Sequence, residues 1–341
     1  MDLTRRDLGK LALAAIPASR LLAKPNSNFD GVQIGVITYS YRSMPGANDA
    51  VALLKYIVDS GISGIELMGP AAEIYAGSPA PAGRGGGGGR GAGGGRPGGA
   101  QARGGGGGMP GGPGRGPGGG RAPLIPEQQA RAAQLKAWRL SVSMDKYKEL
   151  RTMYNTAGVD IYALKLEPNP SMSDEEYEYI FRVADTLGAN QVTLELSNDA
   201  AFTKRIGDFA ARKNMRVAYH AHTQATLTAW DGVLAQSDGN AINLDCGHYV
   251  AGTSESPIPL IRKHSSRIAS MHLKDRKKGT NGGANLPWGQ GDTPIKEILV
   301  LMRQEKYKFP ASIELEYQIP EGSDAVVETS KCVQLCKNAL A

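Results

Sequence analysis

Residues 190–221 read NQVTLELSNDAAFTKRIGDFAARKNMRVAYHA, and this stretch decides the fold class. It begins and ends with short runs of β-branched and apolar residues, at 190–196 and 215–221, which are typical of buried strands. The segment between them, 200–214, has the apolar spacing of a helix that buries one face. A strand, a helix and a second strand in this order predict a βαβ unit, in which the two strands lie parallel.

The same alternation recurs along the rest of the chain. Helical patterns separate most of the apolar runs, and several of them end in Gly just before the next run, as helix C-termini often do. Eight such units predict an α/β protein, a (β/α)₈ TIM barrel. An open, doubly wound sheet is the alternative, but no G-x-G-x-x-G motif follows the first strand. The predicted strands are 34–40, 61–67, 159–166, 190–196, 215–221, 241–247, 267–273 and 311–317, and the predicted helices are 48–61, 143–158, 173–188, 200–214 and 293–307.

Residues 77–123 consist almost entirely of Gly, Arg, Pro and Ala, which predicts a disordered insertion within one barrel domain spanning 32–341. Arg-Gly repeats can bind RNA, but such segments usually contain aromatic residues and this one has none. The formal net charge is +6, yet the insertion carries six arginines and no acid, and residues 1–24 carry a net charge of +3. The remaining chain is therefore mildly acidic, and we expect no nucleic-acid partner.

Residues 1–24 predict a twin-arginine export signal. Paired arginines, Arg5 and Arg6, precede a short apolar stretch and then small residues. A bare amphipathic helix is the alternative. We therefore expect a periplasmic or otherwise exported protein with no stable membrane insertion after signal cleavage, because no other segment is apolar enough to cross a bilayer. The three cysteines give no disulfide framework, and Cys332 and Cys336 are expected to pack inside a helix.

The active site of such a barrel lies at the carboxyl ends of its strands. Charged residues end most of the predicted strands, and four of the five histidines are among them. In VAYHAHT, residues 217–223, two histidines lie two apart and so point to the same side of a strand. Two structural histidines remain an alternative, whereas His264 is expected to be exposed at a helix end. The strand-end residues are Glu66, Glu195, His220, His222, Asp245, His248, His272, Lys274, Asp275, Glu314 and Glu316.

Carboxylate and imidazole ligands together suit one divalent metal ion, Mn²⁺, Co²⁺, Zn²⁺, Fe²⁺ or Mg²⁺. At these residues the sequence resembles the xylose isomerase-like sugar phosphate isomerase/epimerase superfamily, which includes ketose 3-epimerases, inosose dehydratases and hydroxypyruvate isomerases. The resemblance covers the chain from about Val32 onward, apart from the insertion. The phrases that carry it are GIEL (64–67), LDCGHY (244–249), MHLKD (271–275) followed by LPWGQGD (286–292), and SIELEY (312–317).

The resemblance implies a metal bound by a Glu, an Asp, a His and a Glu from four successive strands. Asp245, His272 and Glu314 match the last three of these ligands. Glu316 shares a face with Glu314 and is the alternative for the last ligand, although the spacing from Pro310 favours Glu314. His220 occupies the position of the first Glu, so the fourth ligand is His220 itself, His222 or Glu195 from the preceding strand, and the sequence leaves these open.

The resemblance also implies chemistry on a small carbohydrate. We expect an isomerase or epimerase that acts on a keto-sugar through an enediolate, with Glu314 as one base and His220 or His222 as the acid or base on the other face. A metal-dependent lyase or dehydratase of 3-keto-glycosides or inosose-like substrates fits a histidine equally well. A non-catalytic sugar-binding barrel and a metal-dependent endonuclease are the weaker alternatives, and a homo-oligomer stays open. The expected substrate-binding residues are Glu66, His248, Lys274, Arg276, Trp288 and Tyr39.

Overall fold

The computed structural model describes residues 24–79 and 126–341. The predicted export signal and nearly all of the predicted insertion lie outside these residues, so both stay predictions. Among the described residues, no helix is both long and apolar enough to span a bilayer.

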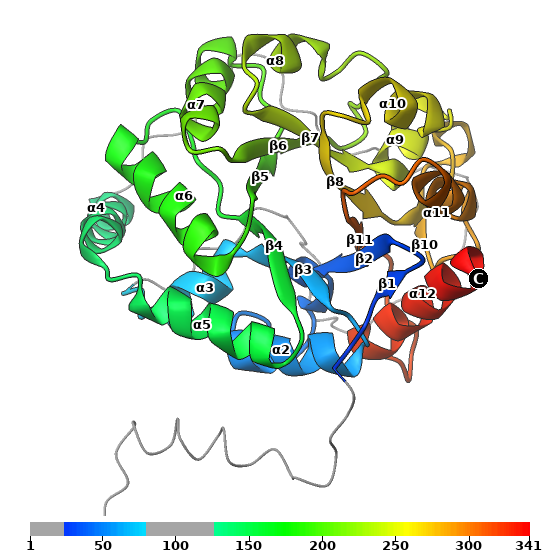
Figure 1. The fold of residues 1–341 in the computed structure, drawn as a ribbon, viewed down its shortest axis with the longest axis horizontal. Helices are drawn as coiled ribbons and strands as arrows, with labels where there is room; N and C mark the ends of the chain where they lie inside the picture. Colours follow the sequence, from blue (N-terminus) through cyan, green and yellow to red (C-terminus); the bar gives the residue numbers. More distant parts are fainter. Residues whose placement is uncertain (1–23, 80–125) are drawn as a thin grey trace, which may run out of the picture.

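Eight parallel strands close into a barrel, and helices form a ring around it (Figure 1). The strands follow one another around the barrel in chain order, and the last one, β11, pairs with the first, β2. All eight predicted strands are confirmed, and the open doubly wound sheet is wrong because β2 pairs on both sides. The strands are β2 (Val32–Ile37), β3 (Gly64–Met68), β4 (Asp160–Lys165), β5 (Gln191–Glu195), β6 (Arg216–His220), β7 (Asn240–Asp245), β8 (Ile268–Leu273) and β11 (Ala311–Ile313).

The five predicted helices are confirmed as α2 (Ala50–Asp59), α5 (Asp145–Thr156), α6 (Asp174–Leu187), α7 (Ala200–Arg212) and α11 (Ile295–Gln304). The helix expected around the two C-terminal cysteines is α12 (Ala325–Leu340), in which both are buried. The elements not predicted are mostly too short to show a period: β1 (Asn28–Phe29), η1 (Thr38–Tyr41), α3 (Gly69–Tyr75), α8 (Asp231–Gln236), α9 (Cys246–Thr253), α10 (Ile258–His264), β9 (Asp275–Arg276), η2 (Gly279–Asn281) and β10 (Asn285–Leu286).

Local sequence signals fix where the helices begin and end. α6 starts with a capping box, in which Ser173 and Glu176 each satisfy a free backbone N–H of the first turn. It ends at Gly188, whose φ of 90° is a left-handed conformation that glycine adopts without strain. The carboxylates of Asp49 and Asp199 accept the free N–H groups at the starts of α2 and α7. By fixing the ends of the helices, these caps determine where the chain leaves each helix to enter the next strand.

The barrel interior is polar, in contrast to the apolar layer between strands and helices. Tyr162 on β4 fills the lower part of the barrel and hydrogen-bonds Ser312 on β11 across it. A Cβ on Gly35 would lie 2.2 Å from the Tyr162 hydroxyl, so only glycine fits there. Further fully buried polar side chains, among them Thr193 and Asn243, lie between Tyr162 and the barrel mouth. Such groups are stable in the interior only with partners, and both Thr193 and Asn243 donate a hydrogen bond to the carboxylate of Glu66.

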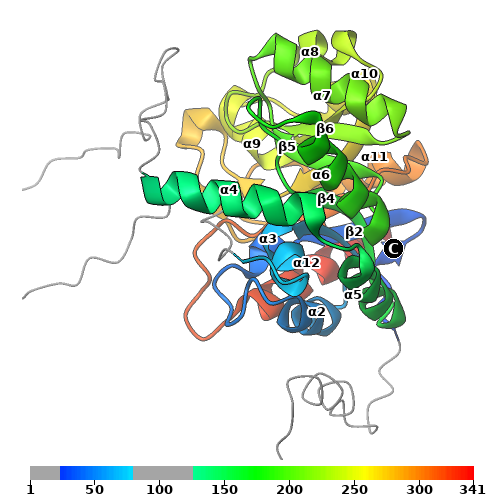
Figure 2. The same cartoon turned by 90° about the vertical axis from the view of Figure 1, so that its left-hand side faces the viewer.

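One further helix, α4 (Pro126–Ser141), lies outside the ring; its C-terminal part packs against α6, and its N-terminal part projects away from the barrel (Figures 1 and 2). Its Arg139 makes two hydrogen bonds, of 2.7 and 3.0 Å, to the buried carboxylate of Glu73 on α3. Tyr179 of α6 donates a third to the same carboxylate. Because α3 precedes the predicted insertion and α4 follows it, the Arg139–Glu73 ion pair links the two helices that flank the predicted insertion in the chain.

Candidate active site

Four strand-end side chains meet in the barrel mouth, as the sequence predicts. One ligand atom each of His220, Asp245 and His272 lies within 4.8 Å of the others. The Glu314 carboxylate lies 3.0 Å from Nδ1 of His272. All four side chains are buried. Residues from β6, β7, β8 and the end of β11 therefore form one cluster.

Strand register explains this convergence. Asp245 on β7 lies beside His272 on β8, and His272 lies beside Ser312 on β11. Glu314 is two residues beyond Ser312, so its side chain points to the same side, into the barrel. His220 ends β6 next to Asn243 of β7. The two-residue period of the strands thus turns all four side chains to the same face, into the barrel.

Glu66 on β3 supports the cluster from below. One carboxylate oxygen lies 2.7 Å from Nε2 of His272 and accepts a 3.1 Å hydrogen bond from Asn243, while the other accepts a 2.6 Å bond from Thr193. Burial alone would raise the pKa of Glu66, but the His272 imidazole lowers it below its ordinary value. Glu66 thus fixes the orientation of His272 and directs Nδ1 toward the cluster.

The same cluster perturbs its own proton affinities. Burial would lower the pKa of His272, but Glu66 and Glu314 raise it to about 10. Burial would raise the pKa of Glu314, but Lys274 and then His272 hold it well below its ordinary value. A raised pKa of His272 beside a lowered pKa of Glu314, in one buried cluster, is typical of functional sites.

Asp245 has two separate tasks at the end of β7. Its Oδ1 accepts a 2.7 Å hydrogen bond from the backbone N–H of His248 and so caps α9. Its Oδ2 remains directed at the cluster, 2.9 Å from Nζ of Lys274. The capping bond holds the carboxylate in a single orientation, which a ligand for a metal requires.

The histidines at 220, 222 and 248 form a second group whose ligand atoms lie within 4.8 Å of one another. His248 is unsuited to a metal in this arrangement, because Nζ of Lys274 lies 3.1 Å from its Nε2 and Arg276 contacts its Nδ1. Burial and then Lys274 lower the pKa of His248 to about 2. Burial, followed by the charge of His272, likewise lowers the pKa of His220 well below its ordinary value. Both are therefore neutral imidazoles in this arrangement.

The residues of the main cluster fit a divalent metal ion. Each contributes one buried atom directed into the cluster: His220 Nδ1, Asp245 Oδ2, His272 Nδ1 and Glu314 Oε2. The last three of these atoms make ionic contacts with Lys274 or with one another. Two imidazole nitrogens and two carboxylate oxygens are the donor set that transition metals accept. Glu195, in contrast, is half exposed and pairs with Lys165 at 3.1 Å. His222 is also largely exposed. Of the three candidates for the fourth ligand, the geometry favours His220.

The loop that follows β8 is folded around Asp275. Its carboxylate accepts backbone hydrogen bonds from Gly289, Gly291 and Thr293. This loop carries Trp288, whose side chain is largely buried. The sequence placed Asp275 only by its distance from a strand end and did not predict that it accepts the backbone hydrogen bonds of this loop.

The remaining predicted residues lie at the edge of the cluster or away from it. Arg276 donates to the carbonyl of Gly283 and contacts His248, so its donors are already engaged. Tyr39 lies in η1, half-buried, with the guanidinium of Arg42 over its ring. His264 does end a helix, but the prediction that it is exposed is wrong. Its side chain is only 11% exposed and lies 3.1 Å from Asp231, a partner contributed by α8.

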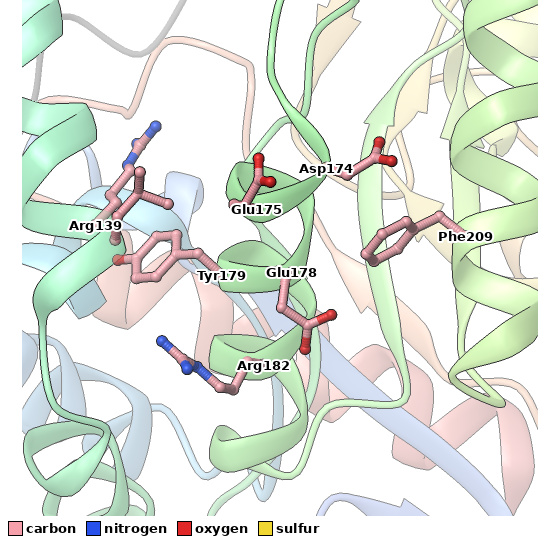
Figure 3. A pocket seen from close by; sticks show the side chains of 8 residues that line it. Arg139, Asp174, Glu175, Glu178, Tyr179, Arg182 and Phe209 are labelled. Carbon is pink, nitrogen blue, oxygen red and sulfur yellow. The ribbon is translucent and has the colours of Figure 1, made fainter.

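Outside the barrel mouth, a cavity of about 370 Å³ lies between α4, α6 and α7 (Figure 3). It is lined mainly by charged side chains of α6, including Asp174 and Glu178, which pair with Arg205 and Lys213. None of the strand-end residues takes part in it. We therefore place the candidate site in the barrel mouth.

Solved structures share this fold along almost the whole chain. One is a sugar phosphate isomerase/epimerase from Parabacteroides distasonis, with a TM-score of 0.55 and 15% identity, covering 94% of this chain and 98% of the other. Another is the probable 3-DHS dehydratase of Bacillus anthracis involved in petrobactin synthesis, with a TM-score of 0.56 and 14% identity, covering 89% and 99%. At these identities the likeness shows the fold alone.

Among curated proteins, the chain is similar to an inosose dehydratase from Clostridium botulinum. The two are 29% identical over 132 residues, which is 33% of this chain and 44% of the relative. The chain thus matches less than half the length of that relative. The model of one protein family matches residues 130–334, more than half of the chain. The chain belongs to the family of xylose isomerase-like TIM barrels.

Proposed function

We propose that the protein is a divalent-metal-dependent isomerase or epimerase that acts on a keto-sugar or sugar derivative through an enediolate. The observation that carries this proposal is the buried cluster of His220, Asp245, His272 and Glu314, whose four ligand atoms are directed into one site. A decayed, purely sugar-binding barrel would have no physical reason to keep such a costly set of buried charges.

A divalent ion held by this cluster would polarise the substrate carbonyl and stabilise the enediolate that forms when the neighbouring carbon loses its proton. The residues of the chain supply the proton transfers. Glu314 is ionised at neutral pH because its pKa lies well below the ordinary value, so it can accept the proton. His220 is neutral, so it can also accept or return a proton from its own side of the cluster.

A carbon–oxygen lyase is the second candidate, and two observations favour it. The curated relative is named inosose dehydratase. In addition, the group that accompanies Glu314 in the cluster is a neutral imidazole, which can take up a proton released from the substrate carbon and then deliver it to a departing hydroxyl or glycosidic oxygen. Inosose-like compounds and 3-keto-glycosides are the substrate classes that this reaction would use.

The discriminating experiment follows the carbon next to the carbonyl. Purified protein is loaded separately with Mn²⁺, Co²⁺, Zn²⁺, Fe²⁺ and Mg²⁺ and incubated in D₂O with keto-sugars, inososes and 3-keto-glycosides. NMR detects deuterium that enters this carbon. Incorporation without loss of a group supports the isomerase or epimerase. Release of water or of an aglycone supports the lyase. No exchange and no release with any metal would leave only a sugar-binding barrel.

Glu314→Gln is the matched variant for this experiment, because it removes the carboxylate that is both the proposed base and a proposed metal ligand, and it keeps the shape of the side chain. We expect deuterium exchange to fall by about a thousandfold, within the usual range for a general base. Glu321→Gln is the control, since it makes the same chemical change at an exposed position. Equal exchange rates in the two variants would contradict the role of Glu314.

We further propose that the chain is exported by the twin-arginine route and works in the periplasm. This proposal depends on Arg5 and Arg6 and on the short apolar stretch behind them. Replacing both arginines by lysine should retain the protein in the cytoplasm on cell fractionation. Unchanged export of this variant would exclude the route.

A further inference from the structure

The ammonium group of Lys274 lies inside the candidate metal site. The side chain is 2% exposed. Its Nζ lies 2.9 Å from Oδ2 of Asp245 and 2.8 Å from Oε2 of Glu314. These are the same two oxygens that the metal ligand set would contribute. The lysine therefore neutralises the ligand oxygens themselves, not groups behind them.

The chain is shaped to admit this lysine. A Cβ on Gly247, in the first turn of α9, would lie 2.3 Å from Cγ of Lys274 and 2.7 Å from its carbonyl oxygen. Glycine at 247 thus lets the lysine stem lie flat against α9 and reach the cluster. An alanine at this position would push the stem away.

The contacts of Lys274 are of two kinds. Those with Asp245 and Glu314 are close, yet both oxygens lack a partner in hydrogen-bond geometry. Those with Glu316 and His248 are hydrogen bonds, of 2.7 and 3.1 Å. Glu316 is also nearer to solvent, with 23% of its side chain exposed. The ammonium can therefore leave the first pair of oxygens while it keeps the second pair of partners.

We propose that Lys274 is a resident cation that competes with the divalent ion for Asp245 and Glu314, and that Glu316 retains it when the ion binds. Two cations cannot share these oxygens at close range without strong repulsion in a buried site. The metal must therefore displace the ammonium. This inference rests on the proposed metal-dependent function and describes how that site is loaded.

Lys274→Met tests the competition, since methionine keeps much of the stem and removes the charge. Co²⁺ and Mn²⁺ are the probes, with affinity from calorimetry and coordination from the visible absorption of bound Co²⁺. We expect the variant to bind each ion at least about tenfold more tightly than the wild type, because the ion no longer displaces a charge. Lys277→Met is the control: it removes a lysine charge from the same loop, where Lys277 pairs with Asp292, and should leave the affinity near that of the wild type.

Glu316→Gln supplies a second test that does not depend on the folding of the first variant. It weakens the partner that retains the displaced ammonium, so the metal affinity should fall in the wild-type background. In the Lys274→Met background the same change should have little effect. An equal loss in both backgrounds would overturn the role given to Glu316 and Lys274, since Glu316 would then act on the ion directly.

The outcomes separate this inference from the proposed function. Tighter binding in Lys274→Met supports the competition, and binding seen only in this variant supports it while it refutes a metal-dependent wild type. Equal or weaker binding in Lys274→Met overturns the competition and leaves the metal site intact. Absence of binding in both proteins overturns both.

Discussion

Glu66→Gln is the sharpest test of how the cluster is supported. Glutamine has the shape of glutamate and can still bond Thr193, Asn243 and Nε2 of His272. The change therefore removes the negative charge beside the imidazole and little else. It addresses the 2.7 Å contact between Glu66 and His272 directly.

The expected magnitude follows from this contact. A carboxylate that orients a ligand histidine contributes about 10- to 100-fold to metal affinity. This corresponds to about 1.4 to 2.7 kcal/mol. A hydrogen bond to a charged group contributes about 1.5 to 3 kcal/mol, so the two independent scales agree. We expect Glu66→Gln to weaken Co²⁺ binding within this range and to keep a melting temperature close to that of the wild type.

Thr193→Val is the matched control. It removes the 2.6 Å hydrogen bond to the other oxygen of Glu66 but keeps the carboxylate beside His272. Its effect on metal affinity should stay within about threefold, below one charged hydrogen bond. An affinity of Glu66→Gln within twofold of the wild type would refute the orienting role. A raised KM with unchanged metal affinity would instead assign Glu66 to a substrate hydroxyl.

Three further outcomes follow from the structure. Asp275→Ala leaves three backbone N–H groups without their acceptor, so thermal unfolding should show a loss of about 2 kcal/mol and the fluorescence of Trp288 should shift; an unchanged melting curve would contradict the folding of the loop around this carboxylate. Glu73→Ala leaves the guanidinium of Arg139 and the hydroxyl of Tyr179 without their carboxylate partner, so urea unfolding should show that the free energy of unfolding falls by about 3 kcal/mol. The double variant Arg139→Met plus Glu73→Leu should recover part of this loss, because it removes both charges of the pair. Removal of metal with EDTA should lower the melting temperature, and restoring the ion at a hundred times its Kd should return about 2.7 kcal/mol; a melting temperature indifferent to both treatments argues against a bound ion.

The barrel was predictable because its elements repeat a strong local signal. Each strand is a short apolar run, and most of the long helices have a clear 3.6-residue period bounded by a cap. α8, α9 and α10 were not predicted, since six to eight residues contain too few turns to show a period. His264 was misjudged for a related reason: its exposure depends on α8, a helix that the sequence did not reveal.

The convergence of the site residues was predictable, and their partners were not. Asp245, His272 and Glu314 occupy strand ends, and parallel register in a closed barrel makes strand ends meet. Thr193 and Asn243 sit inside strands, where a polar residue signals burial with a partner but does not say which partner. Their common partner is Glu66, which lies far from both in the chain. Contacts of this kind depend on the closure of the barrel.

The histidine at 220, where the resemblance to the family implies a carboxylate ligand, bears on the choice between the two proposed reactions. Reversible epimerisation needs two groups of similar proton affinity on opposite faces of one carbon, so that either can act as acid or base. Glu314 and His220 are unlike in charge: one is an ionised carboxylate paired with Lys274, and the other a neutral imidazole among three further histidines. Elimination needs only one base at the carbon and a proton donor at the leaving oxygen. The more the two groups differ when the site is loaded, the more the site should favour a lyase, and the product analysis in D₂O reads this difference directly.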